Sequence, residues 1–311
     1  MNLFIIFFVA TIVLFLLAWM IRPTRATTDE LKNFLIHPAI PSQFKNFEGI
    51  EIHFHQVGTG PDLVLIHGIG ASTYIWRNLI PILSRQFRVT AIDLPGFGRS
   101  QKVHNFNFSL DSMSEFVAKF LASVGVLQFG LVGSSMGANI SLWIAKNHPT
   151  KCNRVVSIAP AADPSLVVYS KFILSLLRPL HFLVNSWTMK MAVHNVLNNK
   201  KFANSELVQG YLLPFRDDGS AWKCFLNATH IVRDPRLPTE LAELNSRPEF
   251  HHLSLWGDDD RVVPKRVQDE LKKILSNSQF LVLKSLGHHP FEEDPAGIAL
   301  LIEDFFLKKP N

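Results

Sequence analysis

Six short apolar runs recur along the chain, and segments with helical periodicity lie between them. The runs cover residues 63–66, 88–92, 129–132, 155–158, 252–256 and 280–283. Runs that are apolar on both faces are typical of strands buried in a parallel sheet. Apolar residues at helical spacing lie at 110–124, 136–146 and 267–275. The alternation predicts an α/β fold, a mostly parallel sheet with helices on both faces, in which ligands bind at the carboxyl ends of the strands.

The composition narrows the class of protein. The apolar fraction is 47% and the charged fraction 18%, which excludes collagenous and intrinsically disordered chains. The 31 Lys and Arg residues exceed the 26 Asp and Glu residues by five, and no basic block marks a nucleic-acid surface, so no nucleic-acid partner is expected. The two cysteines, Cys152 and Cys224, cannot by themselves form a disulfide framework or a zinc site. No metal or organic cofactor is expected.

The N-terminal run from Leu3 to Ile21 holds 19 residues without a charge. A helix of this length, at ~1.5 Å per residue, would span about 28 Å, close to the ~30 Å hydrocarbon core of a bilayer. A cleaved signal peptide is the alternative, but no Lys or Arg precedes the run, and the run is longer than such peptides require. The prediction is a single-pass transmembrane helix over residues 1–22 and a juxtamembrane linker over 23–48. Arg22 and Arg25 then favour the cytoplasmic side for the rest of the chain.

The third apolar run leads into Gly133-Ser134-Ser135-Met136-Gly137, after which helical spacing begins. This is the pattern G-x-S-x-G between a strand and a helix. The tight turn needs small residues around the central serine and lifts its hydroxyl to a helix N-terminus. Backbone N–H groups and the helix dipole favour a developing anion there. An ordinary Gly-Ser turn is the alternative interpretation, and Ser135 is the candidate nucleophile.

A serine hydroxyl needs a base, and the base needs an orienting carboxylate. On this topology the expected order along the chain is serine, acid, histidine. The fifth run ends before three consecutive aspartates, residues 258–260, and the sixth is followed by Gly287-His288-His289-Pro290. Both segments follow strand ends, so we expect them on the same edge of the sheet as Ser135. The residue types alone do not choose among the three aspartates.

With these motifs the chain resembles the α/β-hydrolase superfamily, in its serine esterase and lipase branch, over residues 50–305 apart from one insertion. The motifs are, in chain order, His67-Gly68-Ile69-Gly70-Ala71-Ser72, Asp93-Leu94-Pro95-Gly96-Phe97-Gly98-Arg99-Ser100, the Gly133–Gly137 turn, Gly257–Asp260 with Pro264, and Gly287-His288-His289-Pro290. The resemblance implies the α/β-hydrolase fold. It also implies a catalytic triad of Ser135, Asp260 and His288. The backbone N–H groups of Ile69 and Met136 are implied as the oxyanion hole.

Other polar residues near the motifs have alternative interpretations. Some relatives place the triad acid after the fourth strand, where this chain has Asp163, and that alternative stays open. His289 is expected to be a loop or pocket residue. His67 is expected to shape its turn by hydrogen bonding, and His148 to cap a helix or lie at the surface.

Residues 161–248 interrupt the alternation and are predicted to form a helical lid on a core made of residues 49–160 and 249–311. From Ser165 to Ser205 the insertion has five Lys or Arg residues, no acid and many large apolar residues. Such a segment suits a lipid interface, and an apolar lid suits an acyl chain in the pocket below it. The alternative is that these residues simply pack onto the core with the lysines in water.

Together these features predict a membrane-anchored serine hydrolase that cleaves carboxylic esters with apolar acyl groups, such as monoacylglycerols, through an acyl-enzyme. The expected partners are a small-molecule ester or lipid and the membrane. Hydrolases of thioesters, amides or carbon–carbon bonds share the same machinery and are one alternative. A catalytically silent, membrane-tethered binding module is the alternative from a different class.

Overall fold

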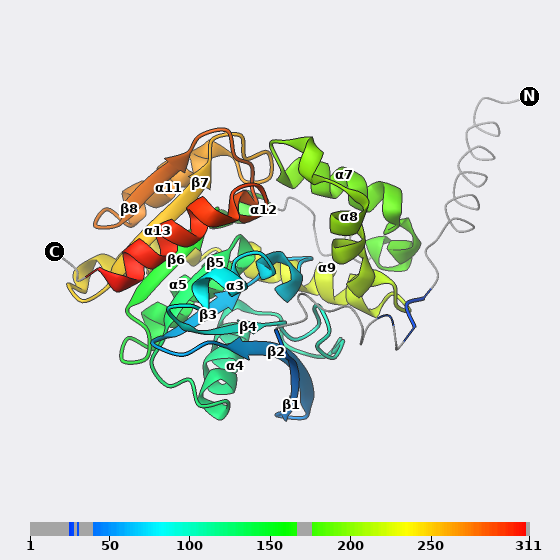
Figure 1. Ribbon diagram of the computed structural model, residues 1–311, viewed down its shortest axis with the longest axis horizontal. Coiled ribbons are helices and arrows are strands. Elements are labelled where there is room, and N and C mark those ends of the chain that lie inside the picture. Colours follow the sequence, from blue (N-terminus) through cyan, green and yellow to red (C-terminus); the bar gives the residue numbers. More distant parts are fainter. Residues whose placement is uncertain (1–24, 28–29, 31–39, 167–175, 309–311) are drawn as a thin grey trace, which may run out of the picture.

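The computed structural model describes residues 25–27, 30, 40–166 and 176–308. Within these residues lies an eight-stranded sheet in the order β1-β2-β4-β3-β5-β6-β7-β8 (Figure 1). The pairs β1–β2 and β2–β4 are antiparallel, and all other neighbouring strands are parallel. The strands are β1 (Ser42–Phe47), β2 (Ile50–Val57), β3 (Asp62–Ile66), β4 (Arg88–Ile92), β5 (Gly130–Ser134), β6 (Arg154–Ile158), β7 (His251–Gly257) and β8 (Gln279–Leu283). The predicted mostly parallel sheet and its six strands are confirmed. The last of them, β8, is an edge strand and is largely exposed, so it is not buried on both faces as the sequence predicted.

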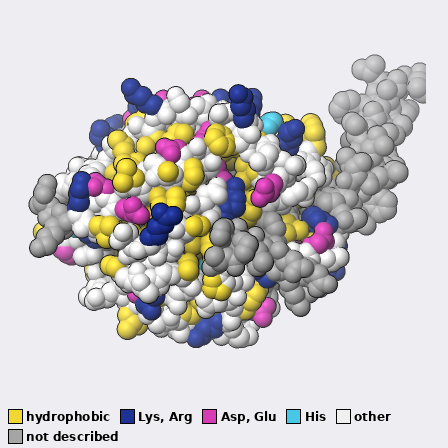
Figure 2. Space-filling view, in the orientation of Figure 1, with side chains coloured by type: hydrophobic (Ala, Val, Ile, Leu, Met, Phe, Trp, Pro, Cys, Tyr) yellow, Lys and Arg dark blue, Asp and Glu magenta, His cyan; other side chains and the backbone are white. Residues whose placement is uncertain are grey.

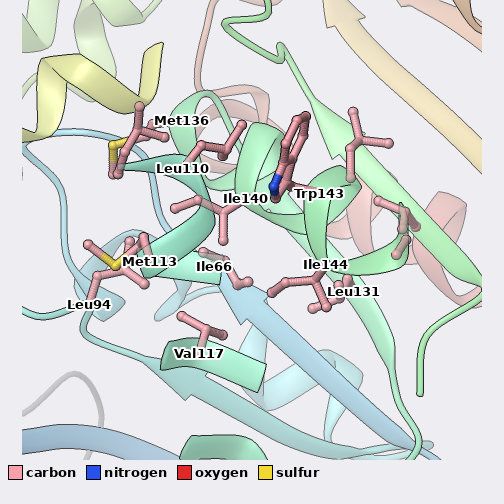
Figure 3. Packing of buried hydrophobic residues seen from close by; sticks show 14 of the residues in the cluster. Ile66, Leu94, Leu110, Met113, Val117, Leu131, Met136, Ile140, Trp143 and Ile144 are labelled. Carbon is pink, nitrogen blue, oxygen red and sulfur yellow. The ribbon is translucent and has the colours of Figure 1, made fainter. Parts of the chain in front are cut away.

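Helices cover both faces of the sheet, because alternate residues of each buried strand point to opposite sides. Val64 and Ile66 of β3 belong to the apolar cluster that includes residues of α4, α5 and α11, whereas Leu63 and Leu65 belong to the cluster on the other face, with residues of α3 and α13. Figure 3 shows Ile66 among apolar side chains from α4 and α5. These helices are α3 (Ile80–Leu83), α4 (Leu110–Ser123), α5 (Met136–Asn147), α11 (Lys265–Ile274) and α13 (Pro295–Leu307). The three predicted helices of the core are therefore present.

Between β6 and β7 the chain leaves the sheet and forms helices inside the predicted lid, 161–248, whose limits stay predictions. The α-helices there are α7 (Ser186–Val196), α8 (Ser205–Leu212), α9 (Ser220–Val232) and α10 (Leu237–Glu240). The 3-10 turns are η2 (Pro164–Leu166), η3 (Arg178–Leu183), η4 (Lys200–Phe202), η5 (Leu213–Phe215) and η6 (Leu241–Ser246). Outside the insertion, η1 (Thr73–Trp76) follows β3 and α12 (Pro290–Glu293) follows β8. In Figure 1, α7, α8 and α9 form a group to one side of the sheet, with α12 at the junction.

The lid helix α7 is apolar on more than one face. Met189 and Val193 are buried, whereas Trp187 and Met191 are exposed. On the face of the molecule seen in Figure 2, hydrophobic side chains are interspersed with basic and acidic ones. The alternative that the apolar lid residues simply pack onto the core therefore holds for part of α7 only.

The β1–β2 hairpin was not predicted, and β1 lies inside residues 23–48, the segment expected to be a linker. β1 pairs with β2 along the whole of β1, from Ser42 opposite His55 to Phe47 opposite Ile50, and Glu48 and Gly49 make the turn with φ of +51° and +80°. In β2 the buried positions include His53 and His55, so the strand does not look apolar in sequence. The end of the predicted linker is thus part of the sheet.

The expected membrane localisation is corrected by the structure. Across residues 25–27, 30, 40–166 and 176–308, no helix has both the length and the apolar character needed to cross a bilayer. The predicted anchor, residues 1–22, lies outside the described residues. The predicted cytoplasmic location of the chain after Arg25 depended on that anchor and is withdrawn with it.

Two histidines are buried within the sheet in the neutral form. Burial lowers the pKa of His252 on β7 to about 3, and its Nε2 lies 2.7 Å from the Ser157 hydroxyl. Burial, followed by the neighbouring His53, lowers the pKa of His55 on β2 to about 4. An unfolded chain has histidines with a pKa near ~6.5, so below that pH the unfolded state binds more protons than the native state.

We therefore expect the free energy of unfolding to fall as the pH drops from about 7.5 to about 5, with His252 alone contributing about 2 kcal/mol of that fall. The contribution is fully present above the unfolded pKa and is lost as the pH falls toward the folded value. His252→Phe removes the imidazole, so it should reduce this fall in the free energy of unfolding by that amount, as measured by urea unfolding at both pH values. Phenylalanine is chosen because its ring keeps the contacts with Phe250 and Phe280. His104→Phe, at an exposed position, is the matched control. An equal fall in the wild type and His252→Phe would contradict this account.

Candidate active site

Ser135 stands at a tight turn between β5 and α5. Its backbone angles are φ +54° and ψ −116°, a conformation that is costly for any residue with a side chain. The Ser135 N–H donates to the carbonyl oxygen of Ile158 on the neighbouring strand at 2.8 Å, which fixes the turn to the sheet. A Cβ on Gly137 would lie 2.2 Å from the Ile66 carbonyl oxygen, and one on Gly133 would lie 2.3 Å from the Gly137 carbonyl oxygen. Both glycines of the motif are therefore required by close packing.

The loop after β3 packs directly against the serine. A Cβ on Gly68 would lie 3.1 Å from the Ser135 Cβ, so the backbone that leads to Ile69 passes beside the serine. Met136 is the first residue of α5, where an N–H has no partner inside the helix. Within the described part of the chain, neither the Ile69 nor the Met136 amide donates a hydrogen bond. Their role as an oxyanion hole stays a prediction.

His288 and Asp260 form a buried pair. The Nδ1 atom of His288 lies 2.7 Å from Oδ2 of Asp260, and their side chains are 3% and 2% exposed. The other oxygen of Asp260 accepts hydrogen bonds from the backbone N–H groups of Val262 at 2.8 Å and Val263 at 2.9 Å. The carboxylate is thus held by the loop after β7, with one oxygen left for the imidazole.

The alternative acids contact other partners. Asp258 accepts a hydrogen bond from the Ser285 amide, and Asp259 forms an exposed ion pair with Arg261 at 2.6 Å. Asp163 pairs with Arg266. Burial raises the pKa of Asp163, but hydrogen bonds from Ser165 and Arg266 outweigh it and lower the pKa below its ordinary value. Of the candidate acids, Asp260 is the one in contact with His288.

Ser135 and His288 line the same cavity, which has a volume of about 400 Å³. That volume lies within the ~300–1,000 Å³ range of small-molecule sites. The core contributes Gly68, Ile69, Gly70, Ala71, Ser135, Val262, His288 and His289. The lid contributes Leu183, Val184, Thr188, Met189, Ala192, Val193, Val196, Tyr211, Phe215, Trp222 and Phe225. The structure therefore brings three predicted site residues, Ile69, Ser135 and His288, to one largely apolar cavity, with Asp260 behind His288.

The alpha/beta hydrolase fold family matches residues 61–295, well over half of the chain. The chain belongs to this family. Its membership supports an enzyme that catalyses hydrolysis.

Relatives of this α/β hydrolase differ in the substrates that their names give. It is 27% identical to a pimeloyl-[acyl-carrier protein] methyl ester esterase of Aeromonas hydrophila, over 82% of this chain and 99% of that one. It is 26% identical to a 2-hydroxy-6-oxo-2,4-heptadienoate hydrolase of Pseudomonas putida, over 83% and 93%. The crystal structure of a bacterial membrane phospholipase A matches with a TM-score of 0.69 and 25% identity, covering 86% of each chain.

Two further histidines from the sequence analysis, His67 and His148, have structural partners. The Nδ1 of His67 contacts the Gly68 carbonyl oxygen at 2.8 Å, and its Nε2 accepts from the Leu94 amide at 3.1 Å, so His67 joins the loops after β3 and β4. His148 caps the C-terminus of α5 and contacts Glu115 at 2.9 Å. Both agree with what the sequence predicted for them.

A chain of polar contacts beside His288 was not predicted. His289 Nδ1 lies 2.7 Å from the Tyr211 hydroxyl, which donates to Glu292 at 3.3 Å. Arg77 donates two hydrogen bonds of 2.8 Å to Glu292. Burial, followed by the neighbouring His288, holds the pKa of His289 well below its ordinary value. Burial raises the pKa of Glu292, and Arg77 opposes that rise.

Gly137→Ala tests the close packing beneath the serine. A glycine-to-alanine change inside a helix ordinarily stabilises by ~1 kcal/mol, but here the new Cβ would press on the carbonyl oxygens of Ile66 and His67. We expect a loss of about 2 kcal/mol or more in the free energy of unfolding, measured with urea. Gly125→Ala, where a Cβ meets nothing within 4 Å, should lose only about 1 kcal/mol through its φ of +81°. A Gly137→Ala chain as stable as the wild type would show that the turn around Ser135 accommodates the added Cβ, and would contradict this account of its packing.

Proposed function

We propose that this chain is a serine hydrolase that cleaves carboxylic esters with an apolar acyl group. The observation that carries the proposal is the single cavity onto which Ser135 and His288 open, with Asp260 bound behind the histidine and a largely apolar wall around them. Each buried methylene contributes about 0.8 kcal/mol, so an acyl chain is the substrate part that this wall favours. Monoacylglycerols and short-to-medium acyl esters fit that description.

The first half of the proposed reaction forms an acyl-enzyme. The Ser135 oxygen attacks the ester carbonyl carbon, while His288 Nε2 takes the serine proton. Asp260 holds Nδ1 of His288, fixes the ring orientation and stabilises the imidazolium. The carbonyl oxygen becomes an oxyanion held by the Ile69 and Met136 N–H groups. The tetrahedral intermediate collapses, the carbon–oxygen bond to the alcohol breaks, and His288 returns its proton to the departing alcohol.

The second half releases the acid. His288 takes a proton from a water molecule, and the resulting hydroxide attacks the acyl carbon on Ser135. The bond to the serine oxygen breaks, His288 returns the proton to that oxygen, and the carboxylic acid leaves. No change of oxidation state occurs, so the residues of this chain account for every proton that moves.

The cavity wall favours an ester over the substrate of the carbon–carbon bond hydrolases. The Pseudomonas relative is named for a heptadienoate, which carries a carboxylate. None of the described residues that line this cavity is a Lys or Arg. A buried carboxylate without a cation or a strong donor costs several kcal/mol. The esterase and phospholipase names of other relatives agree with the ester proposal.

Ser135→Ala should abolish turnover of p-nitrophenyl esters, with a fall of at least about 10³-fold in kcat, because the nucleophile is gone. The neighbouring Ser134→Ala is the matched control. Ser134 is fully buried, and its hydroxyl has no hydrogen-bond partner among the described residues. Near wild-type turnover by Ser135→Ala would end the assignment.

Asp260→Asn should lower kcat by about 10³- to 10⁴-fold, because an amide cannot stabilise the imidazolium in the same way. Asp259→Asn should change kcat less than twofold. The Asp259 carboxylate pairs with Arg261 at the surface, and an exposed ion pair of this kind contributes little free energy. Asp163→Asn serves as the second control. A large loss in Asp163→Asn with little loss in Asp260→Asn would move the acid to the position after β6.

A further inference from the structure

Few polar side chains line the cavity besides Ser135 and His288, and two of them are already occupied. The Thr188 hydroxyl donates to the Leu183 carbonyl oxygen at 2.6 Å, and the Trp222 indole N–H donates to the Leu177 carbonyl oxygen at 2.8 Å. Both bonds stay within the lid. The other two are Tyr211 and His289, which bond to each other across the junction of lid and core.

The polar chain leaves Nε2 of His289 as a hydrogen-bond acceptor. Tyr211 donates its proton to Glu292, which pairs with Arg77 and, as a carboxylate, can only accept. The Tyr211 oxygen is then left to accept the proton on Nδ1 of His289. The ring is neutral, since burial keeps its pKa well below the ordinary value. Nε2 therefore bears a lone pair, and no other described residue is bonded to it.

His289 lies beside His288, the residue that protonates the leaving alcohol in the proposed reaction. Its ring stacks on His288, with centroids 5.1 Å apart and an interplanar angle of 25°, and both rings line the cavity. In the proposed reaction, His288 delivers a proton to the departing alcohol. A substituent next to that alcohol oxygen would then lie in the part of the cavity that the His289 imidazole lines.

We propose that His289 is a specificity-determining residue whose Nε2 accepts a hydrogen bond from a hydroxyl on the alcohol part of the substrate. The substrate class is then a monoester of a polyol, with a free hydroxyl on the carbon next to the ester-bearing one. This inference rests on the proposed ester hydrolysis and extends it to the alcohol side.

Packing alone does not require this polar chain. A phenylalanine at 289 would stack on His288 and Phe291 as the imidazole does, since the Phe291 ring lies 5.0 Å from His289. The lid is also held nearby without the imidazole. The His289 amide donates to Val196 at 3.0 Å, and Glu293 accepts from Asn198 and Asn199 at 3.2 and 2.7 Å. Since buried polar groups cost free energy, a preformed acceptor is the role that the side chain adds.

The test compares two esters that share the acyl chain and the three-carbon alcohol skeleton, 1-monodecanoylglycerol and propyl decanoate. Values of kcat/KM are measured for the full chain and for His289→Phe. We expect the glycerol-to-propyl ratio to fall about tenfold in His289→Phe, the factor that corresponds to ~1.4 kcal/mol. The loss should lie mainly in KM, because this bond is present in both ground and transition states.

Two further variants sharpen the comparison. His289→Gln keeps an acceptor oxygen and should recover part of the ratio, whereas His148→Phe, a matched change remote from the cavity, should leave the ratio at the wild-type value. Should His289→Phe fail to fold, Tyr211→Phe takes its place. It removes the group that accepts the Nδ1 proton and should also lower the ratio.

The outcomes separate the two proposals. Turnover of both esters with an unchanged ratio in His289→Phe, or equal losses on both esters, would overturn the role of His289 alone. A wild-type chain without preference for the glycerol ester would do the same. A wild-type chain that hydrolyses neither ester, nor any p-nitrophenyl ester, would overturn the ester proposal and this inference with it.

Discussion

The approach of the first turn of α5 to the end of β3 is the contact on which the site depends. With glycine at 137, the helix N-terminus comes against the carbonyl oxygens of Ile66 and His67, where no Cβ would fit. The chain between β5 and α5 must then turn sharply, and Ser135 takes a φ of +54°. The same crowding brings Gly68 against Ser135. The position of the serine and the nearness of the two candidate oxyanion amides thus follow from one packing constraint.

The parallel strands bring the histidine and the carboxylate to the same place. β7 and β8 are neighbours, and a Cβ on Gly257 would lie 2.2 Å from the Gly287 carbonyl oxygen, so the loops that follow them are pressed together. Asp260 and His288 leave these loops to form their 2.7 Å contact. The His289 ring stacks on His288, and its Nδ1 contacts the Tyr211 hydroxyl of the lid. The lid therefore meets the core next to the candidate base.

The parts that the sequence predicted are those determined by local patterns. Each of the six strands, the turn around Ser135, and the two loops that carry Asp260 and His288 is a segment of a few adjacent residues. The β1–β2 hairpin was missed because its buried positions include His53 and His55, whose partners Asp93 and Pro41 come from other segments. The polar chain from Arg77 to Glu292 joins residues 215 positions apart, so no local pattern could reveal it. Choosing Asp260 over its two neighbours by physical contact likewise required the fold, since it depends on which loop amides hold which carboxylate.

The central claim is that the Asp260–His288 pair activates the hydroxyl of Ser135. The most direct measurement is reaction of the purified chain with a fluorophosphonate, followed by mass spectrometry of its peptides. The account predicts one adduct, on the peptide that carries Ser135, and little labelling when His288 is replaced by alanine. An adduct on another residue, no adduct at all, or equal labelling of the His288→Ala chain would contradict it.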